Sequence, residues 1–339
     1  MTSRLVENSV QHRRGPVRTA VGVVGLAAAA GAGIGVAAHF FGPVSTVVTL
    51  LASFSPLFAV LAALSAVLLA VARHRVAAAA ALLVAVVGVA AQLPLYLGDA
   101  PSETTPGPQL RLLQANIRLG EADPHALAAR VRRDHVDVLT VAELTEAAVG
   151  RLAAAGLERT LPFTYLRPRE GGGGEGIYSR HPLSERRMLP GLRHTNLRAT
   201  VDLPGAEPVA VYALHPLPPY PEPAWRWAVE LDRIGAILAA EGLPLVVGAD
   251  FNSTYDHERF RNLLRAGERD GAPLLDAAEY LGSGIVATYP ADRGFPAVLA
   301  IDRILTRGGT PTSFERVDLP GSDHHGVLSD VLLTPADQR

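Results

Sequence analysis

The chain of 339 residues contains no cysteine and no lysine. The absence of cysteine excludes a disulfide framework, a thiol nucleophile and a thiolate metal site, and it suits an oxidising compartment. All 31 residues in the lysine-plus-arginine class are arginine. Because this bias extends over the whole chain, a single arginine carries little information about function.

Charged residues are missing from three apolar stretches near the N-terminus. The runs at about 19–41, 44–71 and 76–97 contain no Asp, Glu, Lys or Arg. Each exceeds ~18 residues, which is long enough to cross a hydrocarbon core of ~30 Å as a helix. We therefore predict three transmembrane helices within residues 19–98. The alternative is a signal peptide followed by buried helices, but a signal peptide has one short apolar stretch.

Arginines set the predicted orientation of these helices. Residues 1–18 are basic, and Arg73 and Arg75 lie two crossings later. Basic segments face the cytoplasm, so both should lie on that side. Three crossings then place the rest of the chain outside. We expect a multi-pass plasma-membrane protein with a cytoplasmic N-terminus and an extracytoplasmic C-terminal domain.

Residues 99–108 are polar and proline-rich, which predicts an extended linker. From residue 109 to residue 336 the pattern is typical of an α/β domain, with many short strands and helices at about 124–133 and 223–240. Such a pattern predicts two packed sheets flanked by helices. Residues 109–339 carry 25 Arg and 30 acids, a net charge of −5. This balance argues against a basic nucleic-acid-binding surface.

Short polar motifs recur along this domain. Most follow an apolar run that predicts a buried strand, and polar groups at strand ends converge at one rim of a sheet. Together they supply carboxylates, amides and imidazoles, which indicate a divalent-metal site that hydrolyses phosphate esters. The motifs are Gln114–Asn116, Ala142–Glu143, His215–Pro216, Gly248–Asn252, Ile301–Ile304 and Ser322–His325.

These motifs, in this order, resemble the endonuclease/exonuclease/phosphatase superfamily over roughly residues 109–333. The resemblance implies a four-layer αββα sandwich of the DNase I-like type. The three spans before it, and the stretch Ala287–Pro290, resemble membrane-bound members linked to teicoplanin resistance. Those proteins are thought to act on undecaprenyl diphosphate.

The resemblance implies that Glu143, Asn116 and Asp323 hold the metal, which we expect to be Mg²⁺ or Mn²⁺. Hard oxygen ligands of this kind fit Mg²⁺. From the residues alone, two other interpretations are open. Glu143 could be an acid at a helix N-terminus, and Asn116 could be a turn residue.

Asp250 and Asn252 are two positions apart, so in an extended segment they share one face. The resemblance implies that Asp250 orients or deprotonates the attacking water, or protonates the leaving group. It implies that Asn252 contacts the phosphoryl oxygens. A carboxylate fixes the tautomer of a catalytic histidine, and the resemblance pairs Asp302 with His324. His324 is then a general base or a donor to the developing charge.

The remaining candidates are weaker. The resemblance makes His215 a catalytic phosphate contact, although a histidine before a proline-rich turn could be a plain loop residue. Arg180 could bind substrate or simply lie at the surface. His325 and Arg303 depart from the pattern of the family. Ser322 lies beside His324 but lacks the context of a serine hydrolase.

We therefore expect an Mg²⁺-dependent phosphoric ester or diphosphate hydrolase that acts at the outer membrane face. Its partners would be the lipid membrane and a phosphorylated, polyprenyl-type substrate. One alternative is an extracytoplasmic, membrane-tethered endonuclease or exonuclease, which would favour a basic groove. The other is a non-catalytic binding domain, but that interpretation requires missing site residues.

Overall fold

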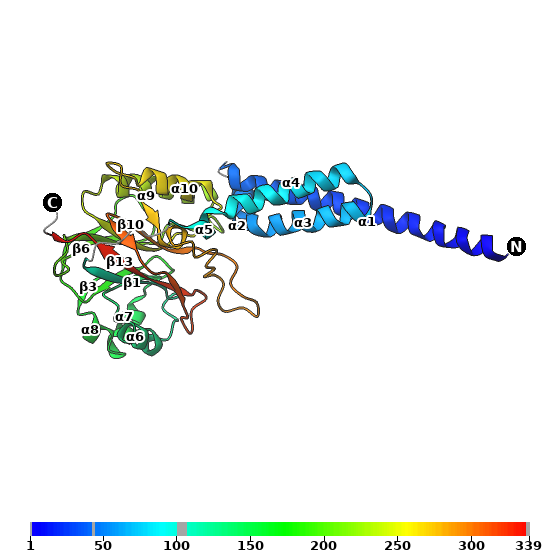
Figure 1. Ribbon diagram of the computed structural model, residues 1–339. Coiled ribbons are helices and arrows are strands. Elements are labelled where there is room, and N and C mark those ends of the chain that lie inside the picture. Colours follow the sequence, from blue (N-terminus) through cyan, green and yellow to red (C-terminus); the bar gives the residue numbers. More distant parts are fainter. Residues whose placement is uncertain (1, 43–44, 100–106, 337–339) are drawn as a thin grey trace. The chain divides into compact units, whose positions relative to one another are not determined.

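The computed structural model describes residues 2–42, 45–99 and 107–336, and the chain divides into two compact units (Figure 1). The first unit comprises Met1–Pro43 and Val47–Leu93, and the second comprises Val44–Thr46 and Pro94–Arg339. Most of the predicted linker at 99–108 lies outside the described residues. The second unit begins at Pro94, earlier than the predicted domain start at residue 109.

The first unit is entirely helical. Small side chains allow its helices to approach closely, and Ala32, Ala62 and Ala85 form one of its packed clusters. The helices are α1 (Thr2–Phe40), α2 (Thr46–Ser53), α3 (Ser55–Val71) and α4 (Arg75–Gln92).

Two of these helices are long and apolar enough to cross a membrane, at Gly15–Phe40 and Arg75–Gln92. The middle apolar stretch differs from the expected straight helix, because α2 and α3 meet at an angle of 72°. Pro56 stands in the first turn of α3, where it is tolerated, but its missing N–H prevents α2 and α3 from continuing as one hydrogen-bonded helix. The helical unit therefore offers two spans, or three if the bent pair is one broken span.

The boundaries of the apolar helices also differ from the predicted ones. The helical backbone of α1 begins at Thr2, well before the apolar run. The third stretch was expected to continue to residue 97, but α4 ends at Gln92 and a separate short helix, α5 (Pro94–Leu97), belongs to the second unit. Pro94 lies at this break, and its ring nitrogen has no N–H with which to continue the helical hydrogen bonds.

The second unit contains two packed sheets. The first has the order β11-β13-β1-β2-β4-β3, with β12 paired to β13, and the second has the order β5-β6-β7-β8-β10-β9. Strands of the first sheet are β1 (Gln109–Asn116), β2 (Val138–Ala142), β3 (Phe163–Arg167), β4 (Glu175–Ser179), β11 (Gly309–Pro311), β12 (Glu315–Val317) and β13 (Gly326–Leu333). Strands of the second are β5 (Leu183–Met188), β6 (Leu197–Val201), β7 (Val209–Leu214), β8 (Leu245–Asp250), β9 (Leu275–Asp276) and β10 (Asp302–Arg307).

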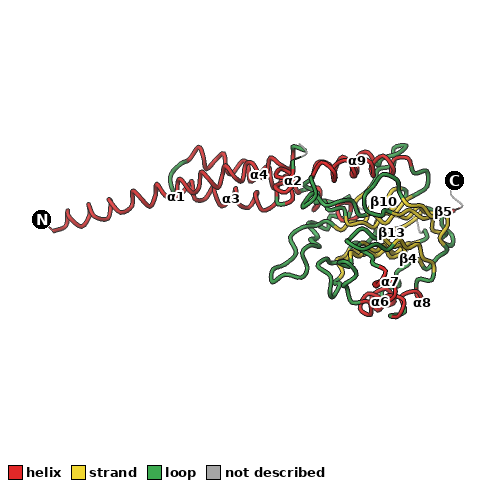
Figure 2. The backbone as a smooth tube through the Cα atoms, turned by 180° about the vertical axis from the view of Figure 1, so that it is seen from behind, coloured by secondary structure: helices red, strands yellow, loops and turns green. Residues whose placement is uncertain are grey.

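Helices cover the outer face of each sheet (Figures 1 and 2). Those on the first sheet are α6 (Pro124–Arg133), α7 (Glu146–Ala154) and α8 (Leu157–Thr160). Those on the second are α9 (Ala224–Ala240) and α10 (Glu258–Ala266), while the short α11 (Ala277–Tyr280) follows β9. The expected four-layer αββα sandwich is confirmed.

Alternation along the strands builds three apolar layers. In β1, Leu110 and Leu112 join the core between the sheets, while Leu113 and Ala115 pack under the helices of the first sheet. On the other side, α9 packs Leu231 against the second sheet. Strands buried on both faces read as continuous apolar runs.

The pairing of the strands brings their polar ends together. β1 and β2 run parallel, as do β7 and β8, so the carboxyl ends of each pair meet. Gly248 brings the two sheets close at this edge, because a Cβ there would lie 2.2 Å from Thr140 Oγ1 and 3.3 Å from Gln114 Cβ. The strand ends of both sheets therefore converge on one site.

Candidate active site

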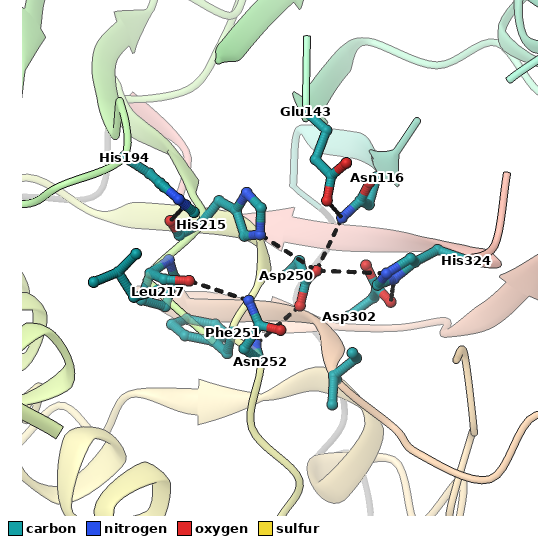
Figure 3. Close-up of polar contacts among 12 residues, drawn as sticks. Asn116, Glu143, His194, His215, Leu217, Asp250, Phe251, Asn252, Asp302 and His324 are labelled. Carbon is teal, nitrogen blue, oxygen red and sulfur yellow. Dashed lines mark hydrogen bonds and ion pairs between the residues drawn. The ribbon is translucent and has the colours of Figure 1, made fainter. Parts of the chain in front are cut away.

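Asn116 connects the two sheets at this edge. It ends β1, and its side-chain amide donates to Asp250 Oδ2 at 3.0 Å and to Glu143 Oε1 at 3.2 Å (Figure 3). Asp250 ends β8 in the opposite sheet and is buried. One amide therefore holds two carboxylates, which keeps their oxygens directed into a common space.

Glu143 follows β2 in a left-handed backbone conformation, with φ of 62°. A non-glycine residue in this region costs free energy, and such residues gather at functional sites. Its second oxygen, Oε2, accepts from the Leu119 backbone N–H at 2.8 Å. The strained backbone and this hydrogen bond hold the carboxylate of the half-buried Glu143 at the rim of the site.

His324 lies between two buried aspartates. Its Nδ1 is 2.8 Å from Asp302 Oδ2, and its Nε2 is 3.8 Å from Asp250 Oδ2. The two aspartates are also paired across β8 and β10. Burial alone lowers the pKa of His324, but the charges of Asp302 and Asp250 outweigh it and raise the pKa to about 10. His324 therefore carries a proton at neutral pH.

His215 follows β7 and faces Asp250 from the other side, with Nε2 at 3.7 Å from Asp250 Oδ2. Its backbone N–H donates to Asn196 Oδ1 at 2.8 Å, and its carbonyl oxygen lies 3.2 Å from His194 Nδ1. Burial and the nearby His215 are the main causes that lower the pKa of His194 to about 4. His194 and Asn196, which the sequence analysis passed over, therefore position His215 as neutral groups.

Glu175 is a further carboxylate that the sequence analysis missed. It begins β4 opposite Ala142, and its Oε1 lies 3.6 Å from His215 Nδ1. Burial raises its pKa well above the ordinary value, and the charges of Asp250 and Glu143 raise it further. The signal for it was an acid directly after the four-glycine loop at 171–174, at the start of an apolar strand.

Asn252 follows Asp250 with a left-handed backbone, at φ of 49°. Its backbone N–H donates to Asp250 Oδ1 at 2.9 Å, and its side chain donates to the Pro216 carbonyl oxygen at 3.1 Å. The GADFN turn therefore folds back on its own aspartate. This turn places the Asn252 amide beside the loop that carries His215 (Figure 3).

Ser322 and Thr288 fix the backbone around the site. Ser322 Oγ donates to the Asn116 carbonyl oxygen at 2.8 Å and accepts from the His324 backbone N–H at 3.0 Å. These bonds make it a positioning residue. Thr288 Oγ1 accepts from the Asp302 backbone N–H at 3.3 Å, and the neighbouring Tyr289 ring lies 4.8 Å from the His324 ring.

Several candidate residues point elsewhere. Arg180 follows the opposite end of β4 from Glu175 and donates to the Val136 carbonyl oxygen at 2.9 Å, so it does not join the cluster. His325 turns away to Asp318, with 3.0 Å between Nδ1 and Oδ1. Arg303 is buried and donates to Asp276 Oδ2 at 2.8 Å, which makes it part of the frame of β9 and β10.

Asp323 stands half-buried beside this cluster. Burial is the main cause that raises its pKa; the positive charge of His324 lowers it, and the negative charge of Glu143 raises it. Asp323 therefore lies in the field of the same carboxylates, although its own oxygens make no described bond to Asn116 or Glu143.

The donor set fits a divalent metal ion. One atom each from Asp250, Asp302 and His324 lie within 4.8 Å of one another in a buried group that could hold such an ion, which would there compete with the proton of His324. Glu143 adds a further carboxylate, held on the same Asn116 amide as Asp250. Buried atoms with no hydrogen-bond partner include Asp302 Oδ1, Glu175 Oε1 and His215 Nδ1. Such atoms have unused capacity to accept a ligand or a proton.

The chain matches the model of the endonuclease/exonuclease/phosphatase family over residues 113–324, more than half of its length. It therefore belongs to this family, whose members are divalent-metal-dependent hydrolases, including nucleases and phosphatases. No curated protein sequence matches the chain at a significant level.

Solved structures of similar fold come from several organisms. D. rerio TDP2 humanized by 14 mutations has 19% identity and a TM-score of 0.53, over 66% of this chain and 98% of that chain. The endonuclease/exonuclease/phosphatase from Beutenbergia cavernae has 20% identity and a TM-score of 0.51, over 66% and 72% of the two chains. The one from Bacteroides vulgatus has 17% identity and a TM-score of 0.50, over 67% and 100%. At these identities the likeness shows the fold alone.

Proposed function

We propose that this protein is a membrane-anchored, Mg²⁺- or Mn²⁺-dependent phosphoesterase that acts on a lipid-linked phosphate or diphosphate at the outer membrane face. Undecaprenyl diphosphate is the model substrate. The observation that carries the hydrolase assignment is the cluster of incompletely compensated carboxylates at the convergence of the two sheets. The protonated His324 supplies one positive charge to Asp302 and Asp250, and within the described parts of the chain no arginine forms an ion pair with Glu143, Glu175, Asp250 or Asp302.

One imidazolium does not balance several buried carboxylates, and buried charges without a partner are costly, so such a cluster favours a bound cation. Glu143, Asn116 and Asp323 would offer the hard oxygen ligands that Mg²⁺ prefers. When bound, the ion neutralises phosphate oxygens and lowers the pKa of its water.

The remaining residues donate or accept protons and contact the phosphate. His324 carries a proton, so it acts as a donor to a phosphoryl oxygen and stabilises the negative charge that develops there. Asp302 holds its imidazole in place through Nδ1. Asp250 accepts the proton of the attacking water, and His215 and Asn252 contact the phosphate from the other side of Asp250.

The membrane part of the proposal rests on the apolar helices of the first unit. Basic residues precede the first span, Arg73 lies between α3 and α4, and Arg75 is the first residue of α4. If the bent pair is one span, both basic segments face the cytoplasm and the catalytic unit faces outside. A lipid-linked substrate then meets the site at high effective concentration.

A membrane-tethered nuclease is the second candidate. One similar structure is D. rerio TDP2 complexed with a single-strand DNA product, at 19% identity and a TM-score of 0.53. A nuclease would need to attract a polyanion, but residues 109–339 carry a net charge of −5. The acidic balance therefore favours the lipid-linked substrate.

The test compares both substrates on the full-length protein in vesicles. With Mg²⁺ present, we expect phosphate release from an undecaprenyl diphosphate carried in the bilayer and little cleavage of plasmid DNA. The Asp250→Asn variant controls for contaminating phosphatases. Robust DNA cleavage without phosphate release would identify the nuclease instead.

A further inference from the structure

The loop between α11 and β10 is an uncovered apolar feature of the catalytic unit. In both views of the backbone it projects beyond the sheets as a long orange or green loop (Figures 1 and 2). Phe295 is 54% exposed and Val298 is 40% exposed, and Ile285 is exposed at the start of the loop. Large apolar side chains that gather on a projecting loop indicate an interaction surface.

The tip of this loop is a closed hairpin at residues 290–298. Tyr289 and Leu299 pair as an antiparallel bridge, and the Val298 backbone N–H donates to the Tyr289 carbonyl oxygen at 2.9 Å. The apolar tip is therefore held out by a fixed base. Half of nine residues can reach about 13 Å, which exceeds the ~5–10 Å depth at which interfacial segments lie.

The base of the hairpin is bonded to the active site. The Ala291 backbone N–H donates to the Asp323 carbonyl oxygen at 2.7 Å. Asp292 forms a 3.1 Å ion pair with Arg118, which is two residues after Asn116. Tyr289 contacts the His324 ring. Whatever binds the tip therefore lies next to the phosphate site.

The start of the loop is bonded to α5, the segment that follows the last apolar helix. The Gly284 backbone N–H donates to the Leu95 carbonyl oxygen at 2.7 Å, and the Asp99 backbone N–H donates to the Tyr280 carbonyl oxygen at 2.8 Å. A Cβ on Gly284 would lie 2.7 Å from the Tyr96 ring, so the contact is close.

Covalent geometry then identifies what the loop meets. Leu95 follows Gln92, the last residue of α4, by three positions, which limits their separation to about 11 Å. The loop therefore starts near the end of a helix that is apolar enough to cross a membrane. Leu97 is 74% exposed and Tyr96 is exposed beside it, as is typical of side chains at a membrane interface.

From these contacts we propose that the hairpin at residues 290–298 inserts Phe295 and Val298 into the lipid–water interface and holds the active site at the bilayer surface. The proposal rests on the membrane anchorage proposed above. Arg293, which is exposed and paired with Asp292, then lies at the level of anionic headgroups. A lipid-linked diphosphate reaches the site along the hairpin, with its chain still in the bilayer.

The absence of cysteine makes a direct test clean, because one introduced cysteine is the only labelling site. Phe295→Cys carries a nitroxide in the full-length protein, reconstituted in vesicles of phosphatidylglycerol and phosphatidylethanolamine. We expect this label to collide with oxygen, which is lipid-soluble, and to be shielded from a water-soluble nickel chelate. Met188→Cys is the matched control, because Met188 is 57% exposed on an edge strand of the second sheet, and its label should show the reverse.

A label at residue 295 that behaves like the one at 188 would overturn the insertion. A label at residue 295 that is shielded from the nickel chelate by single-stranded DNA but not by vesicles would also overturn it. Val298→Cys repeats the measurement if Phe295→Cys does not fold. This readout needs no turnover, so it decides the insertion even if the protein hydrolyses no lipid diphosphate.

A kinetic test addresses the same hairpin. The double variant Phe295→Ser, Val298→Ser should lower kcat/KM for a vesicle-borne diphosphate by about tenfold or more, since it removes two large apolar side chains from the interface. Its kcat/KM for a short-chain soluble diphosphate should not change, and Met188→Ser should change neither. An equal loss on both substrates would contradict the proposal. A wild type inactive on both would instead count against the proposed function.

Discussion

Two buried groups of charged residues in the catalytic unit differ in how their charges are balanced. In the first, the active-site carboxylates contact amides and histidines. In the second, which we name the Arg198 cluster, Arg198 Nε donates to Glu241 Oε2 at 3.0 Å and Tyr212 Oη donates to the same oxygen at 2.8 Å. Glu185 and Thr200 complete that cluster through Arg198 Nη1.

The pKa values record this difference. Burial would raise the pKa of Glu241, but hydrogen bonds from Tyr212 and Arg198 outweigh it and lower the pKa. At the site, burial and neighbouring carboxylates raise the pKa of Glu175. The Arg198 cluster is therefore complete in the folded chain. The active-site cluster needs a proton or a cation to complete it, and for this reason we assign it to catalysis.

Removal of metal should have the largest effect, because it acts on the active-site cluster and not on the Arg198 cluster. EDTA should abolish hydrolysis, because the carboxylate cluster loses the cation that completes it, and Mg²⁺ or Mn²⁺ should restore activity. Glu143→Gln should need a higher Mg²⁺ concentration for half-maximal rate. Phosphate release during a metal titration measures both. Full activity of Glu143→Gln in EDTA would disprove the ligand assignment.

Substitution of the residues that handle protons should have the next largest effect. Asp250→Asn and His324→Ala should each lower kcat by at least ~10², since both act on protons or developing charge in the reaction. Asp302→Asn should lower kcat by a smaller factor, because Asp302 only orients His324. His325→Ala is the control and should be mild, as His325 faces Asp318. Steady-state kinetics on the lipid diphosphate decide this, and an essential His325 would contradict it.

Substitution in the Arg198 cluster should lower the stability of the folded protein. Glu241→Gln removes the buried carboxylate partner of Arg198 and leaves only the exposed Glu185, so we expect a loss of about 3 kcal/mol in unfolding free energy. Glu175→Gln is the matched comparison and should not destabilise the metal-free protein. Both tryptophans, Trp225 and Trp227, lie in α9, so their fluorescence during urea unfolding reports on this unit. Equal losses in both variants would remove the distinction between the clusters.

The same two glutamates should give opposite pH dependence. The folded pKa of Glu241 is lowered, so its stabilisation is present above the ordinary carboxyl pKa and is lost as pH falls through the folded pKa. The folded pKa of Glu175 is raised, so its contribution to the stability of the metal-free protein is fully present at low pH and is lost as pH rises toward that pKa. Urea unfolding of the metal-free protein from pH 2 to pH 8 should show each of these two pH dependences vanish in its own Gln variant.

Asp330→Asn should have the smallest effect. Hydrogen bonds from Arg111 and Ser313 outweigh burial and lower the pKa of Asp330. Because the Arg111 side chain is 34% exposed, we expect the pair to contribute only about 0.5–1 kcal/mol at neutral pH. This contribution should disappear as pH falls through the folded pKa of Asp330. A similar difference between variant and wild type at pH 2 and pH 7 would contradict the ion pair.

Much of the catalytic fold could be predicted from the sequence, because strands buried on both faces leave a strong apolar signal. β2 and β7 coincide with apolar runs of the sequence, and α6 matches the helix predicted at about 124–133. α10 and β5 were not predicted. The outer face of β5 is almost wholly exposed, so its apolar pattern is weak.

Some residues of the candidate site could be predicted from the sequence and others could not. Residues in short motifs at strand ends, such as Asn116 and Asp250, are visible because a polar group there interrupts an apolar run. Glu175 has no such motif and enters the site only because β4 runs antiparallel to β2. The same pairing sends Arg180 to the far end of the strand, where it contacts Val136.

Local properties can be inferred from the sequence: apolar helices at the N-terminus, buried strands after them, and polar residues where those strands end. These follow from composition and periodicity within a few residues. Which polar residues meet depends on the tertiary structure, because the packing of the two sheets brings the Asn116 amide to Asp250, 134 positions away. It also decided the protonation of His324 and Glu175, since a pKa depends on burial and on charges that the fold brings near.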